Sequence, residues 1–113
     1  MAVTIWHNPA CSNSRGALAL IRQAGIEPVV VDYLGTPPDI ATLREVLAES
    51  GLSAAELVRS KEAQFAELGL AGADDAALLA AMAEHPRLIN RPVVRTAKGT
   101  RLCRPPETVL ELL

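Results

Sequence analysis

Residues 3–31 read VTIWHNPACSNSRGALALIRQAGIEPVVV, and this stretch decides the fold. It opens with a short, mostly apolar run at residues 3–6 and closes with three valines at 29–31, both typical of strands. Between them, apolar residues recur at helical spacing from Ser14 to Ala24, and Gly25 ends the helix. The stretch therefore predicts a β-α-β unit, whose strands we expect to be parallel with a right-handed crossover.

Cys11 lies where the first predicted strand gives way to the helix, among small and polar neighbours. The start of a helix offers backbone N–H groups without partners and the positive end of the helix dipole, and both favour a thiolate. The thiolate is the nucleophilic form of cysteine. Arg15, and His7 when protonated, would act in the same direction. A free cysteine is often a small buried hydrophobe instead, but the polar neighbours suit a loop better than a core.

The motif around this residue is Cys-x-x-Ser, because Ser14 stands where a dithiol redox site has its second cysteine. A single activated cysteine needs a resolving thiol from elsewhere. The other cysteine of the chain, Cys103, follows Leu102 in an apolar neighbourhood. It could resolve Cys11, but the pattern favours a core residue.

The middle of the chain, from Pro37 to His85, is predicted to be nearly all helical. The segment 36–39 reads TPPD, with Thr36 as the expected cap and a proline at the first helical position. Gly51 should end that helix. Two further helices should start at a capping box on Ser53 and at Asp74 or Asp75.

The C-terminal part predicts a β-hairpin from residues 92–96 and 100–103 around Lys98-Gly99, followed by a helix opened by Pro105-Pro106-Glu107. The order is thus β-α-β, a helical insertion, and β-β-α. Without the insertion this is the order of a thioredoxin-like domain. We therefore expect an α/β fold: one domain over residues 1–113, with a thioredoxin-like mixed sheet and a helical insertion at about 37–85 between the second and third strands.

In that fold, a proline before the third strand lies beside the reactive cysteine, commonly after a cis peptide bond, and Pro92 stands in that place. Arg91 directly precedes it, and Arg104 follows the last strand at the same end of the sheet. Arg59 lies in the helical insertion. The planar guanidinium matches a tetrahedral oxyanion, so convergence of these arginines on Cys11 is our hypothesis for an anion site.

Composition narrows the classes of partner. The chain has a net charge of −2, yet residues 86–104 hold six basic side chains and no acidic one, which suggests a small anionic ligand rather than nucleic acid.

Nothing in the sequence resembles a secretory signal or a membrane span, so no membrane partner is expected. Two cysteines make no disulfide framework, and we expect a cytoplasmic protein. No residues have metal-ligand spacing, so no metal is expected.

The chain resembles the glutaredoxin-coupled ArsC family of arsenate reductases over essentially its whole length. The resemblance is carried by the order and spacing of four stretches: His7-Asn8-Pro9-Ala10-Cys11 with Ser14-Arg15, Leu57-Val58-Arg59, Leu88-Ile89-Asn90-Arg91-Pro92-Val93-Val94, and Gly99-Thr100-Arg101-Leu102-Cys103-Arg104-Pro105. Ser12-Asn13, the Ser-Lys-Glu after Arg59, and the Pro105-Pro106-Glu107 ending resemble a housekeeping ArsC-like branch.

This resemblance implies a role for each matching position. Cys11 resembles the cysteine that attacks arsenate, and the oxyanion-binding arginines would be Arg59, Arg91 and Arg104. The residues expected to support them are His7, Asn8, Ser14, Arg15 and Pro92, with His7 modulating the thiolate. No bound cofactor is implied. Glutathione would be the co-substrate that attacks the cysteine-arsenate adduct, and glutaredoxin would reduce the resulting mixed disulfide to release arsenite.

Two other functions use the same cysteine. A monothiol glutaredoxin-like thiol-disulfide oxidoreductase would need Cys11 but not three arginines. An Spx-like redox-sensing regulator shares the fold, although such proteins usually carry Cys-x-x-Cys, where Ser14 stands here. We expect a monomer in each case.

Overall fold

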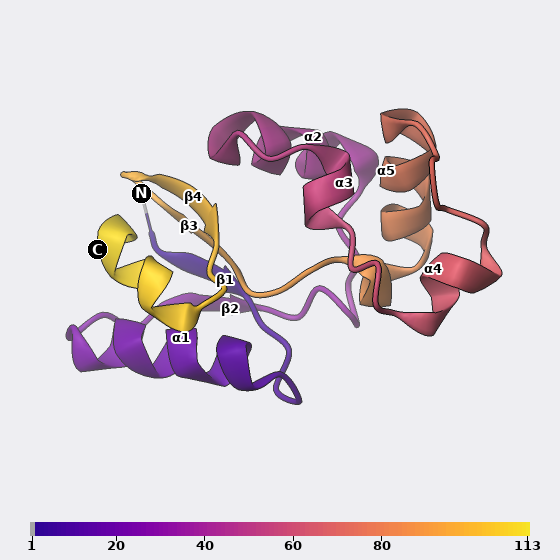
Figure 1. Cartoon of the computed structure of the whole chain (residues 1–113). Coiled ribbons are helices and arrows are strands. Elements are labelled where there is room, and N and C mark those ends of the chain that lie inside the picture. The colour runs from indigo at the N-terminus through magenta and orange to yellow at the C-terminus, as the bar shows by residue number, and fades with distance from the viewer. Residues whose placement is uncertain (1) are drawn as a thin grey trace. The chain divides into compact units, whose positions relative to one another are not determined.

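The computed structural model describes residues 2–113, which form two compact units (Figure 1). The first unit consists of the chain up to Tyr33 and of Arg91–Leu113, and the second is Leu34–Asn90. The first unit contains β1 (Thr4–Trp6), α1 (Ser12–Gln23), β2 (Val29–Val31), β3 (Val93–Thr96), β4 (Gly99–Leu102) and the 3-10 helix η2 (Pro106–Leu112). The second contains α2 (Ile40–Ser50), α3 (Ala54–Leu57), α4 (Ala63–Glu67), α5 (Asp75–Glu84) and the 3-10 helix η1 (Pro86–Leu88).

The strands of the first unit form one mixed sheet in the order β2-β1-β3-β4. β1 runs parallel to β2 and antiparallel to β3, so that Ile5 pairs with Val30 on one side and with Val94 on the other. β3 and β4 form the predicted antiparallel hairpin. This is the thioredoxin-like α/β sheet that the sequence predicts.

One face of the sheet is covered by α1 and η2, which lie side by side in Figure 1. The core on this face joins the sheet, both helices and the segment after β4, through Ile5, Ala17, Ile21, Val94, Cys103, Val109 and Leu112. α1 and η2 approach closely at Gly16, where an added Cβ would lie 3.1 Å from Pro106 Cγ. Trp6 alternates with Ile5 along β1 and stacks on Tyr33, with 6.4 Å between ring centroids.

α1 begins at Ser12, two residues before the predicted start at Ser14. Cys11 is its N-cap, with extended backbone angles, and its carbonyl accepts the first helical hydrogen bond from Arg15. The first-turn N–H groups need no partner within the helix, so the polar residues before Ser14 can join it at little cost. The shift places Cys11 directly at the helix terminus.

α2 begins at Ile40 and is capped by Asp39, not by Thr36 as predicted. The Asp39 carboxylate accepts a hydrogen bond of 2.8 Å from Thr42 N. The two prolines after Thr36 explain the difference, because a residue that precedes proline is driven out of the helical region. The end of the helix is as predicted: Gly51 adopts a left-handed conformation with a φ of 74°.

The other predicted helix starts of the second unit are confirmed. Ser53 and Glu56 form the reciprocal capping box, and Asp74 caps α5. The four α-helices α2 to α5 all lie between β2 and β3 in chain order. That the whole chain is one domain with an insertion at about 37–85 stays a prediction.

The C-terminal region differs from the prediction in two details. β4 already begins at Gly99, so the turn is Ala97-Lys98 and not Lys98-Gly99. The final helix is a 3-10 helix. A hydrogen bond of 2.9 Å from Thr96 Oγ1 to Leu112 O joins the last residue of this helix to the hairpin.

The Arg91-Pro92 peptide bond is cis, as predicted, and so is the Arg104-Pro105 bond. Within residues 2–113, no helix has both the length and the apolar character needed to cross a bilayer.

Candidate active site

The cysteine loop is held in shape mainly by Asn8. Its side-chain oxygen accepts a hydrogen bond from Ala10 N at 3.0 Å, and its carbonyl accepts one from Cys11 N, also at 3.0 Å. Arg15 supports the same loop, because its guanidinium donates to Pro9 O at 2.8 Å. Cys11 is therefore presented at the end of α1 with its side chain partly accessible.

Two arginines from distant parts of the sequence reach Cys11. Arg104 Nη1 lies 3.7 Å from Cys11 Sγ and donates to the carbonyl of Arg91 at 2.9 Å. The Arg91 side chain also acts on the thiol, because it lowers the pKa of Cys11. Pro92 follows Arg91 through the cis bond, at the start of β3. The structure thus brings together three of the residues selected from the sequence, Cys11, Arg91 and Arg104, and Pro92 directly follows one of them.

The surroundings of Cys11 favour its thiolate. Partial burial opposes ionisation, but the backbone N–H of Ser14, the Arg91 side chain, the backbone N–H of Asn13 and the Arg104 side chain together lower the pKa of the Cys11 thiol. Two of these donors are first-turn N–H groups of α1 and two are cations. The expected effect of the helix terminus is thus present, and the basic partners are Arg91 and Arg104 rather than Arg15.

Asn13 was not among the residues that the sequence pointed to. With its amide oxygen toward Arg104, it accepts hydrogen bonds from Nη1 at 3.3 Å and Nη2 at 3.2 Å. This orientation of the amide is the one in which donors face acceptors. The available signal was a polar residue in the first turn after the nucleophile, but nothing local indicated a contact with Arg104.

His7, Asn8 and Ser14 form a small hydrogen-bonded group beneath the loop. The Ser14 hydroxyl is fully buried, lies 2.6 Å from His7 Nδ1 and accepts a hydrogen bond of 3.0 Å from Asn8 N. Burial and the charges of Arg22 and Arg15 lower the pKa of His7, which keeps the imidazole neutral. A neutral ring can accept the Ser14 proton at Nδ1, so His7 orders the loop rather than adding a positive charge to it.

Arg59 belongs to the second unit. Its backbone is fixed there by the isolated bridge between Val58 and Ile89 and by the hydrogen bond from Arg59 N to Leu88 O. Its guanidinium lies 3.9 Å from Glu62, which also pairs with Arg87 at 3.2 Å. The oxyanion role of Arg59 stays a prediction.

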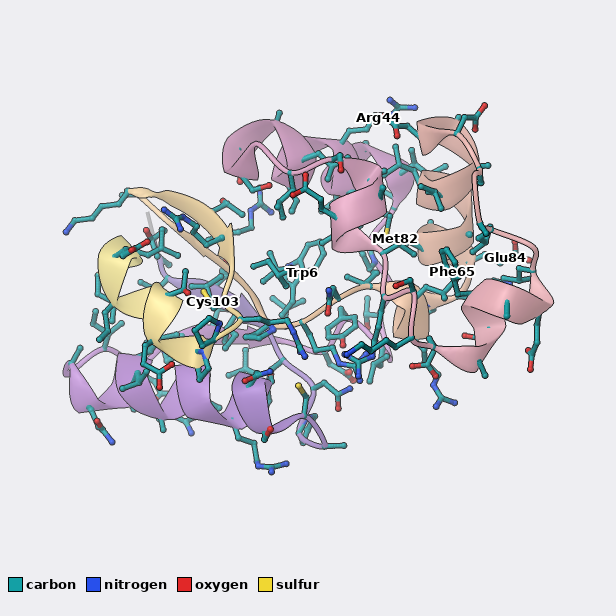
Figure 2. The ribbon with its side chains drawn as sticks, in the orientation of Figure 1. Trp6, Arg44, Phe65, Met82, Glu84 and Cys103 are labelled. Atoms are coloured by element: carbon teal, nitrogen blue, oxygen red, sulfur yellow. The ribbon has the colours of Figure 1, made fainter. Side chains whose placement is uncertain are left out.

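The remaining histidine, His85, was expected at a helix end and lies at the C-terminus of α5. Its Nδ1 is 3.5 Å from Gln64 Nε2 on α4. In the same unit, Figure 2 shows Phe65 on α4 and Met82 and Glu84 on α5. Met82 is fully buried, whereas no residue of α4 is buried.

Cys103 lies in a different environment from Cys11. It belongs to the core between the sheet, α1 and η2 and is completely buried (Figure 2). Burial raises the pKa of the Cys103 thiol to about 12, with Arg101 acting weakly against this and Glu111 in favour. Its thiol contacts Arg101 O at 3.8 Å. The core position predicted for this residue is confirmed, and a buried, protonated thiol is a poor resolving group.

No group of three or more His, Cys, Asp or Glu side chains that could hold a metal occurs within residues 2–113. The side chains around Cys11 supply the chemistry of a thiolate beside two guanidinium groups. Such an arrangement can attack an electrophilic centre that carries negative oxygens.

Comparison with known proteins places this chain in a family. Residues 6–112 match the model of the ArsC family. An arsenate reductase of Rhizobium meliloti (strain 1021) is 56% identical over 115 residues, covering 100% of this chain and 82% of the relative. The uncharacterized protein YfgD of Escherichia coli (strain K12) is 48% identical, covering 98% of this chain and 96% of the relative. An arsenate reductase from Vibrio cholerae has the same structure with a TM-score of 0.95, at 46% identity, covering 100% of this chain and 98% of the other. The chain belongs to the ArsC family.

Proposed function

We propose that this protein is an arsenate reductase that uses glutathione and glutaredoxin as its source of electrons. The observation that carries the proposal is the contact of 3.7 Å between Cys11 Sγ and Arg104 Nη1, beside the side chain of Arg91. A thiolate nucleophile and an oxyanion cradle thus occupy one place. A disulfide oxidoreductase needs only the first of these.

In the first step, Cys11 Sγ attacks the arsenic(V) centre of arsenate. A sulfur–arsenic bond forms, and one arsenate oxygen leaves as water after taking up protons. Arg91 and Arg104 offset the negative charge on the remaining oxygens, which would otherwise repel the thiolate. The lowered pKa of Cys11 supplies the reacting form near neutral pH.

In the following steps, thiols outside the chain deliver two electrons. Glutathione attacks the adduct, the sulfur–arsenic bond breaks with its electron pair on arsenic, and Cys11 is left in a mixed disulfide with glutathione. Glutaredoxin then exchanges with this disulfide and restores the Cys11 thiolate. Overall, arsenic(V) becomes arsenic(III), which leaves as arsenite, while two external thiols become a disulfide. Cys103 is not needed, because it is buried.

The supporting residues act on this chemistry through the loop and the strand beside it. Asn8, Ser14, His7 and Arg15 hold the loop by the hydrogen bonds described above. Pro92 lies between Arg91 and the first residue of β3 and so connects the Arg91 backbone to the sheet. Arg59 enters the proposal as a third oxyanion-binding arginine because it matches the arginine of the family pattern.

The proposal also includes the setting in which the enzyme works. Both cysteines are free thiols, and glutathione-dependent turnover needs a reducing compartment, so we expect the cytoplasm. We expect a monomer, because glutaredoxin must approach Cys11 directly.

The test is arsenate-dependent oxidation of NADPH in the presence of glutathione, glutathione reductase and glutaredoxin. We expect turnover by the wild type that requires glutathione and disappears in Cys11→Ser. Reduction of a small disulfide without arsenate turnover would instead identify a monothiol oxidoreductase. If folded, reduced protein showed neither activity, the proposal would be wrong. Binding to RNA polymerase would then test whether the protein is a redox-sensing regulator.

A further inference from the structure

We propose that Asn13 is a positioning residue that holds the guanidinium of Arg104 beside Cys11 Sγ. The inference rests on the proposed function, because it assigns Asn13 a part in the oxyanion site. It follows from contacts within the first unit alone.

Arg104 needs such a holder because its side chain is exposed. An exposed arginine has many rotamers of similar energy, and a single contact of 3.7 Å with a sulfur atom does not select one of them. The Arg91 carbonyl accepts from Nη1 at 2.9 Å but leaves the guanidinium free to turn about that bond. These two contacts therefore do not fix the orientation of the guanidinium plane.

Asn13 supplies the missing constraint. Its amide oxygen has two lone pairs and accepts from Nη1 at 3.3 Å and from Nη2 at 3.2 Å, so both terminal nitrogens of Arg104 are bound to one atom. Together with the Arg91 carbonyl, this contact fixes the guanidinium plane on two sides.

Asn13 itself stands on a rigid element. It is the second residue of α1, and its backbone N–H is one of the groups that lower the pKa of the Cys11 thiol. One residue therefore acts on both the nucleophile and the cation that faces it. Any movement of the helix terminus carries Cys11, Asn13 and Arg104 together.

The neutral charge of the Asn13 amide also suits its position beside a thiolate and an oxyanion site. An aspartate would hold the guanidinium equally well but would put a negative charge next to a thiolate and an oxyanion. Asparagine binds Arg104 while leaving its positive charge available. This difference gives the inference its test.

The experiment measures alkylation of Cys11 by iodoacetamide as a function of pH, with and without arsenate. The pH dependence gives the pKa of Cys11, and the arsenate concentration that protects the thiol gives the affinity of the site. The variants are Asn13→Leu, which removes the acceptor, and Asn13→Asp, which keeps it. Ser12→Ala, at the exposed preceding position, is the matched control. Circular dichroism and thermal unfolding show that each variant is folded.

For Asn13→Leu we expect the pKa of Cys11 to rise by about 0.5 and protection to require about tenfold more arsenate, as for a lost hydrogen bond to a charged group. Both effects should vanish when Asn13→Leu is made in an Arg104→Leu background, because Asn13 acts through Arg104. The effect of Asn13→Asp should persist there, because its charge acts on the thiolate directly. Ser12→Ala should match the wild type.

An Asn13→Leu variant with the pKa and arsenate protection of the wild type would overturn the inference. So would an effect that stays the same size without Arg104. The proposed function fails separately: if arsenate neither protects the wild type nor is reduced, but Asn13→Leu still raises the pKa of Cys11 through Arg104, the positioning role stands and the substrate assignment falls.

Discussion

The loop around Cys11 and the segment that carries Cys103 place the same side chain in opposite states within one unit. Cys11 is partly accessible, and two first-turn N–H groups and two arginines lower the pKa of its thiol. Cys103 is fully buried among apolar side chains, which raises the pKa of its thiol to about 12. The difference shows that the donors around the sulfur, and not the cysteine itself, decide which thiol can react.

The largest effect should come from removing the reactive sulfur. Cys11→Ser keeps the size of the side chain but replaces a thiolate with a hydroxyl that stays protonated, so arsenate-dependent NADPH oxidation should fall to background. Matched circular dichroism spectra would show that the fold is retained. If the variant still reduced arsenate, the roles of the two cysteines would be reversed and Cys103 would have to be the nucleophile.

The next largest effect should come from removing a donor while keeping the sulfur. Arg104→Leu deletes the contacts to Cys11 and to the Arg91 carbonyl, so kcat/KM for arsenate should fall about 100-fold, as for loss of one donor to a developing oxyanion. Exchange with a small disulfide should fall much less, since there Arg104 acts only by lowering the pKa of Cys11. Equal losses in both assays would mean that Arg104 serves only the thiolate and not the oxyanion.

A third effect concerns stability at alkaline pH. Below about pH 9 the Cys103 thiol is protonated in the folded and the unfolded chain and adds no pH dependence. Above this, the unfolded thiol loses its proton while the folded one keeps it up to about pH 12, so the free energy of unfolding falls by up to about 1.4 kcal/mol per pH unit.

Urea unfolding at several values between pH 8 and 10.5 measures this slope, and Cys103→Ala is the control that removes it. A variant with the same slope as the wild type would show that Cys103 ionises as readily in the folded chain as in the unfolded one. The contrast between the two cysteines would then be one of access alone.

The smallest effect on catalysis should come from Cys103→Ser. Turnover should stay within about twofold of the wild type, because the buried thiol takes no part in the reaction, while the hydroxyl placed in the apolar core lowers the free energy of unfolding by about 1–3 kcal/mol. Turnover and urea unfolding on the same sample measure both. A folded variant as inactive as Cys11→Ser would give Cys103 the resolving role.

Local patterns were sufficient to predict most of the fold. The apolar runs at β1 and β2, the capping box at Ser53 and the glycine at Gly51 each have a short-range physical cause, so they could be recognised in the sequence. The start of α2 was misplaced because two prolines compete with a threonine cap. η2 packs against α1 and accepts a hydrogen bond from Thr96, and no local pattern reports these long-range contacts.

The candidate site divides in the same way. Cys11 and Pro92 could be placed from the order of elements, since the fold puts them at one end of the sheet. The contact between Asn13 and Arg104 could not be predicted, because it joins residues far apart in sequence and depends on side-chain orientation. The lowered pKa of His7 could not be predicted either, since it is caused by burial and by the charge of Arg22.

The close approach of Gly16 to Pro106 has a consequence for how this chain can change during evolution. Residue 16 is five positions after the nucleophile, and Pro106 follows Arg104 by two. A Cβ added at residue 16 would require the Pro106 ring to give way by a few tenths of an ångström, so the two positions constrain each other's size. Positions 16 and 106 should therefore covary among homologues.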